Sequence, residues 1–163
     1  MHMLHKIVVE AESAEDAVVE AKAGLEHHYL TAYDYFDEDA SGWGDAYASP
    51  ISVEHDKDRF LKELEDVRKA QRAEAFDRMS SLKGINGQTS LEEALRAVFD
   101  GPATYLDSYR IGLAFDLARG SYRFDSGFLD MANGHVAAVT DELVADVEKG
   151  ERDLWMVFFD LHF

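Results

Sequence analysis

The sequence predicts an α+β fold, in which helices pack on a small sheet of three or four strands. Two apolar segments near the ends of the chain, LHKIVVE at residues 4–10 and LWMVFFDLHF at 154–163, are typical of strands. Because both segments contain runs of adjacent apolar residues, we expect these strands to be buried on both faces. About five helices are expected around the sheet, and residues 1–163 are expected to form one globular domain.

Two helices and a second strand are expected in the first half of the chain. Ser13 and Asp16 form an approximate capping box, which predicts a helix directly after the first strand. The aromatic segment 29–37 suits a second strand. The glycines and the proline that follow predict a loop over 40–50. Apolar residues at near-helical spacing then predict one long helix over 57–82.

Two shorter helices are expected in the middle of the chain. Ser90 and Glu93 form a capping box for a helix that ends near Phe99. Leu106, Tyr109, Leu113 and Leu117 have the spacing of a second helix over residues 103–119. The second half of this range also alternates as a strand would, and we favour the helix because the alternation is confined to that half.

The last third of the chain is expected to hold a strand, a helix and the final strand. Residues 121–131 suit a strand with a kink or bulge at Gly127. The apolar spacing from Val136 to Val147 predicts a helix that Gly150 terminates.

Acidic residues dominate the charge, with 33 Asp and Glu against 16 Lys and Arg and a formal net charge of −17. Such a charge repels nucleic acids and anionic membranes, so we expect no direct binding to either. The absence of cysteine excludes disulfides and thiolate chemistry. Because the apolar run near residue 1 is too short for a signal peptide and no stretch has the length of a membrane span, the expected location is the cytoplasm.

Three interpretations of this acidity compete. The acids are dispersed and lysine is scarce, which favours adaptation to a cytoplasm of very high salt. A mimic of nucleic acid that binds a basic protein is the second interpretation, and a cation-binding surface is the third. No resident cofactor is predicted, although the acidic surface could attract the solvent cations Na⁺, K⁺ and Mg²⁺.

Two segments, 23–56 and 124–148, contain no lysine or arginine. The first segment carries Trp43, Asp45 and Tyr47, which could form a surface for a ligand or a cation. The alternative is an ordinary acidic loop. By contrast, the predicted 57–82 helix is nearly balanced in charge and could pair with another copy in a homo-oligomer, although the favoured explanation is an ordinary amphipathic helix with local salt bridges.

One spacing suggests chemistry at the end of the last strand. Asp160 and His162 occupy alternate positions and therefore share one face of the strand. If Asp125 or Asp130 on a neighbouring strand faces the same way, the cluster could bind a divalent cation or transfer protons. The alternative is that the strand simply ends in solvent.

Nucleotide-binding glycine loops, serine-hydrolase elbows and zinc-binding histidine motifs are missing from the sequence. The sequence therefore does not identify an activity. The favoured expectation is a small, salt-adapted cytoplasmic accessory or interaction protein without catalysis. The alternatives are a divalent-cation-binding protein or metal-dependent enzyme that uses the strand-end residues, and an acidic mimic of nucleic acid.

Overall fold

The computed structural model describes residues 2–29, 35–81 and 127–162. The chain divides into two compact units, of which one comprises residues 1–68 with 125–163 and the other residues 69–124. The first unit holds the sheet. The described part of the second unit, 69–81, is the continuation of a long helix. The expectation of one domain over 1–163 stays a prediction.

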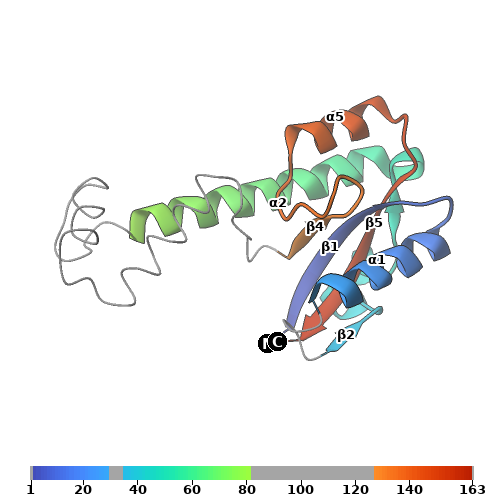
Figure 1. The fold of residues 1–163 in the computed structure, drawn as a ribbon, viewed down its shortest axis with the longest axis horizontal. Coiled ribbons are helices and arrows are strands. Elements are labelled where there is room, and N and C mark those ends of the chain that lie inside the picture. Colours follow the sequence, from blue (N-terminus) through green and yellow to red (C-terminus); the bar gives the residue numbers. More distant parts are fainter. Residues whose placement is uncertain (1, 30–34, 82–126, 163) are drawn as a thin grey trace. The chain divides into compact units, whose positions relative to one another are not determined.

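The predicted α+β class is confirmed by a mixed sheet with the strand order β2-β5-β1-β4 (Figure 1). β1 pairs with β5 in antiparallel fashion along its whole length and with β4 in parallel fashion. β2 and a short strand, β3, occupy the other edge of β5, where β2 pairs with 160–162 and β3 with 155–156. The strands are β1 (His2–Glu10), β2 (Tyr35–Asp37), β3 (Ile51–Ser52), β4 (Phe128–Asp130) and β5 (Leu154–His162).

Three α-helices lie within the described residues, together with two short 3-10 helices in the predicted loop. They are α1 (Ala14–Tyr29), η1 (Ser41–Trp43), η2 (Asp45–Tyr47), α2 (Val53–Ser81) and α5 (Asp141–Lys149). The expected number of about five is therefore not matched by the described residues. The helices predicted after Ser90 and over 103–119 lie outside these residues, as do residues 121–126 of the predicted strand.

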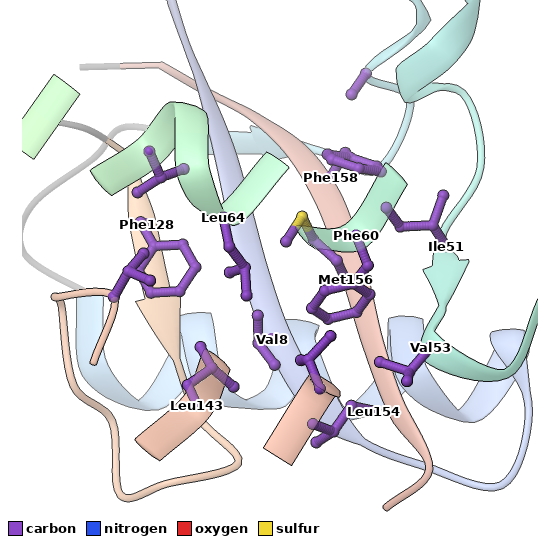
Figure 2. Packing of buried hydrophobic residues seen from close by; sticks show 14 residues of the cluster. Val8, Ile51, Val53, Phe60, Leu64, Phe128, Leu143, Leu154, Met156 and Phe158 are labelled. Atoms are coloured by element: carbon purple, nitrogen blue, oxygen red, sulfur yellow. The ribbon is translucent and has the colours of Figure 1, made fainter. Parts of the chain in front are cut away.

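Both faces of the sheet are covered by helices, as the apolar runs predict. Strand residues alternate between the faces. Ile7, Val157 and Phe159 form one buried cluster with Ala21 and Leu25 of α1. On the opposite face, the buried cluster joins the sheet to α2 and α5 (Figure 2), with contributions from Val8, Met156, Phe158, Phe60, Leu64, Leu143 and Val147.

Helix ends follow local capping chemistry. The backbone N–H of Asp16 donates to Oγ of Ser13 at 3.1 Å, which agrees with the predicted capping box. Gly150 ends α5 in the left-handed conformation with φ 67°, also as expected. The beginning of α5 differs from the prediction, because Val136 pairs with Asp130 through two backbone hydrogen bonds of 2.8 Å. Thr140 then caps a shorter helix.

Candidate functional site

β1 begins beside the end of β5 (Figure 1). Three polar side chains meet there. The antiparallel register places His2 opposite His162 and Leu4 opposite Asp160. Nδ1 of His2 lies 2.9 Å from Oδ2 of Asp160, within hydrogen-bond distance. The rings of His2 and His162 meet edge to face, with 5.0 Å between their centroids. We call these three residues the strand-end cluster.

The strand-end cluster is open to solvent on one side. The side chain of His2 is 56% exposed, whereas that of Asp160 is 22% exposed. Oδ1 of Asp160 is buried and has no hydrogen-bond partner within the described residues. On β2, Asp37 lies directly opposite Asp160. The cluster thus combines an exposed imidazole with a carboxylate that is largely withdrawn from water.

Asp130 lies away from the strand-end cluster, because β1 separates β4 from β5. Asp130 pairs with Val8 of β1, whereas Asp160 pairs with Leu4. This register offset alone corresponds to about 13 Å along the sheet. The structure therefore does not bring together Asp130 with Asp160 and His162, and Asp125 lies outside the described residues.

Asp130 is fully buried at the end of β4. Its carboxylate accepts hydrogen bonds from the backbone N–H of Asn133 at 3.1 Å and from Nδ2 of the same residue at 2.9 Å. Burial raises the pKa of Asp130, and the bonds from Asn133 and the charge of Arg152 partly oppose this shift.

Arg152 connects three parts of the unit, one of which is the segment after β4 that surrounds Asp130. Its Nη1 donates to Oδ1 of Asn133 and to Oδ2 of Asp146, both at 2.7 Å. Its Nη2 donates to Oε2 of Glu10 at 2.7 Å and to the carbonyl oxygen of Ala132 at 3.1 Å. We call this arrangement the Arg152 clamp. Because all of these contacts are internal, the clamp acts as a structural connection between β1, α5 and the segment after β4.

Three candidate residues lie in the loop over residues 40–50, which we call the aromatic loop. Their environments differ. Trp43 is 44% exposed, and Asp45 is exposed at the start of η2. Tyr47 is partly buried, and its ring packs edge to face on Phe158 with 5.1 Å between centroids. Tyr47 therefore serves the core, while Trp43 and Asp45 lie on the surface.

A largely buried ion pair connects the sheet to α2 near Tyr47. Nζ of Lys6 lies 2.6 Å from Oε2 of Glu63, and the two side chains are 14% and 10% exposed. The Lys6 ammonium also lies 5.9 Å from the centre of the Tyr47 ring. This pair was not predicted from the sequence, although Lys6 directly precedes the apolar run at residues 7–9 and Glu63 lies next to Leu64 of the apolar helix face.

His5 is buried on the opposite face from Lys6. Burial lowers the pKa of His5 to about 4, against a smaller raising effect of a hydrogen bond with the backbone of Met3. His5 is therefore neutral near pH 7.

The contact of His2 with Asp160 was not predicted from the sequence either. The signal was present, because two antiparallel strands that start and end together bring residues 2 and 162 into register. Recognising it requires knowing that the first and last strands are neighbours, which spacing within either strand does not reveal.

Residues 2–29, 35–81 and 127–162 contain no group of three or more His, Cys, Asp or Glu side chains arranged to hold a metal ion. In the same ranges, no helix combines the length and the apolar character that crossing a membrane requires. Comparison of this chain with protein-family models, with curated proteins and with solved structures finds no match.

Proposed function

We propose that this protein is an accessory protein of a high-salt cytoplasm, in which an acidic surface maintains hydration. The distribution of carboxylates in the described residues carries this proposal. Glu63 and Asp130 are buried, Glu74, Asp146 and Asp160 are partly buried, and all other described carboxylates are exposed. The exposed acids extend over α1, the aromatic loop, α2 and α5.

The two buried carboxylates already have internal partners. Glu63 pairs with Lys6, and Asp130 accepts hydrogen bonds from Asn133. These acids are engaged inside the unit, whereas the exposed acids contribute to the surface charge. A dispersed acidic surface supports a general effect on hydration more than recognition of one ligand.

Salt is expected to affect such a protein strongly. With a net charge of −17, the excess carboxylates repel one another within a compact molecule. The distance over which charges interact falls from about 10 Å at 0.1 M salt to about 3 Å at 1 M. The free energy of unfolding should therefore rise with salt concentration.

The proposal is tested by urea unfolding, followed by circular dichroism, at KCl concentrations from 0.1 to 2 M. We expect the protein to be least stable in 0.1 M KCl. In a variant with Glu12, Glu20, Glu142 and Glu151 changed to Gln, the salt dependence should be smaller. The matched control carries Asp at the same four positions and keeps the charge. Equal stability at all salt concentrations would contradict the proposal.

Association of two copies through α2 stays a prediction of the sequence. Sedimentation in 2 M KCl tests it directly, because a homo-oligomer has at least twice the mass of the 18.3 kDa chain. A monomer at all protein concentrations would contradict it without affecting the salt proposal.

A further inference from the structure

We propose that His2 and Asp160 form a carboxylate–imidazole dyad, in which Asp160 positions His2 as a proton acceptor open to solvent. This inference is independent of salt adaptation and adds a reactive group to a protein for which the sequence predicts no catalysis. It rests on the geometry of the strand-end cluster.

The hydrogen bond determines which nitrogen of His2 carries the proton. An ionised carboxylate only accepts hydrogen bonds, so Nδ1 at 2.9 Å from Asp160 must be the donor when the ring is neutral. The other nitrogen, Nε2, then carries the lone pair. The same division of roles operates in hydrolases where an aspartate orients a catalytic histidine.

The surroundings favour a fixed Asp160 and an accessible His2. Asp160 lies on β5 between β1 and β2, with pairing to both strands. The His2 ring is 56% exposed. The edge-to-face contact with His162 limits its rotation from one side.

Two carboxylates lie near the position where a positive charge would form on His2. Accepting a proton makes the imidazole positive at hydrogen-bond distance from the Asp160 carboxylate. Asp37 adds a second carboxylate directly opposite Asp160. Two like charges at opposed positions of neighbouring strands destabilise a sheet. A positive charge on His2 reduces this repulsion.

The chemistry that this dyad supports is attack of water on an activated carboxylic ester. Nε2 of His2 accepts a proton from water while the water oxygen forms a bond to the carbonyl carbon. The bond from that carbon to the leaving alkoxide or phenolate then breaks. The products are a carboxylic acid and the alkoxide or phenolate, and the imidazolium returns its proton to solvent. Asp160 is a positioning residue in this step, and His2 is the proton acceptor.

The first test measures the tautomer of His2 by ¹⁵N NMR at pH 8 in 2 M KCl on the full chain. We expect His2 to be mainly the Nδ1–H form in the unaltered protein and to move towards the Nε2–H form in Asp160→Ala. His55 is the matched control, because it is 72% exposed and its Nδ1 lies 3.7 Å from Oε2 of Glu54, beyond hydrogen-bond distance. A mainly Nε2–H form of His2 in the unaltered protein would overturn the proposal.

The second test measures release of p-nitrophenolate from p-nitrophenyl acetate at pH 7.5. General base catalysis in a formed enzyme site accelerates a reaction by about 100-fold or more. For a probe that is not held in a site, we expect His2→Gln to lower the rate of p-nitrophenolate release about threefold. Asp160→Asn should lower the rate in the same direction, whereas the control His55→Gln should leave it nearly unchanged. Equal rates for His2→Gln and His55→Gln would overturn the proposal. Because His2 is exposed, circular dichroism should show His2→Gln folded.

Discussion

The two ends of the sheet contain similar residue types in opposite environments. At the Arg152 clamp, Asp130 is completely buried, and the guanidinium of Arg152 is engaged by four other residues. At the strand-end cluster, His2 has one hydrogen bond within the described residues and is mostly exposed. Burial with many internal partners indicates a structural role. Exposure with a single side-chain hydrogen bond leaves a group able to react.

The largest effect on the free energy of unfolding is expected at the Lys6–Glu63 pair, which lies between the two ends of the sheet. Lys6→Met leaves the Glu63 carboxylate buried without its ammonium, which should lower the free energy of unfolding by about 3–5 kcal/mol. Urea unfolding in 2 M KCl measures this loss. The double variant Lys6→Met with Glu63→Leu should recover most of it, because no charge is then left unpaired. A double variant as unstable as the single one would show that shape, not charge, dominates at this position.

The next largest effect is expected at the Arg152 clamp. Arg152→Met removes the contacts that connect Glu10, Asn133 and Asp146, and we expect a loss of about 3 kcal/mol in the free energy of unfolding. Arg68 is the matched control, because its side chain is similarly buried but its ion pair joins a fully exposed Asp141. Arg68→Met should cost under about 1 kcal/mol. Equal losses would remove the distinction between the clamp and an ordinary surface pair.

A smaller, pH-dependent effect is expected at Asp130. Its pKa is raised on folding, so the native state holds this proton more tightly than the unfolded chain does. The contribution of Asp130 to stability is present below the ordinary aspartate pKa and is lost as the pH rises through the raised value.

As the pH rises from 4 to 7, the free energy of unfolding of the Asp130→Asn variant should therefore increase relative to that of the unaltered protein. Adding Arg152→Met to both proteins should enlarge this change, because the opposing charge of Arg152 is removed. A difference that is constant with pH would mean that Asp130 does not titrate differently in the folded state.

The smallest effect on stability is expected at the strand-end cluster. His2→Gln should change the free energy of unfolding by under about 0.5 kcal/mol, because the side chain is exposed and forms one hydrogen bond. Thermal melts in 2 M KCl measure this difference. A loss as large as that of Arg152→Met would make His2 a structural residue and would remove the contrast between the two ends.

Local sequence patterns predicted the elements wherever local chemistry determines them. Ser13 caps α1, Gly150 ends α5, and the two apolar runs near the ends of the chain predicted the central strands β1 and β5. The start of α5 was wrong because Val136 has the apolar spacing of a helix but pairs with Asp130 across a turn. Periodicity cannot reveal such a bridge, because it depends on a second segment.

The candidate sites depended more strongly on strand order. Asp160 was identified because it shares a face of the last strand with His162, but its partner His2 was not. Asp130 was grouped with Asp160 although β1 lies between their strands, β4 and β5. Sequence spacing fixes which residues share a face of one strand. It does not fix which strand lies alongside.

The sequence by itself determined the α+β class, the helix caps, the net charge of −17 and the buried character of the first and last strands. The net charge follows from composition, and the other properties arise from residues close together in the chain, where capping and apolar patterning act locally. Only the tertiary structure decided that β1 separates β4 from β5, that Lys6 meets Glu63, and that His2 meets Asp160. Those contacts join residues 57 to 158 positions apart, and they exist because burying both faces of the sheet selects one strand order.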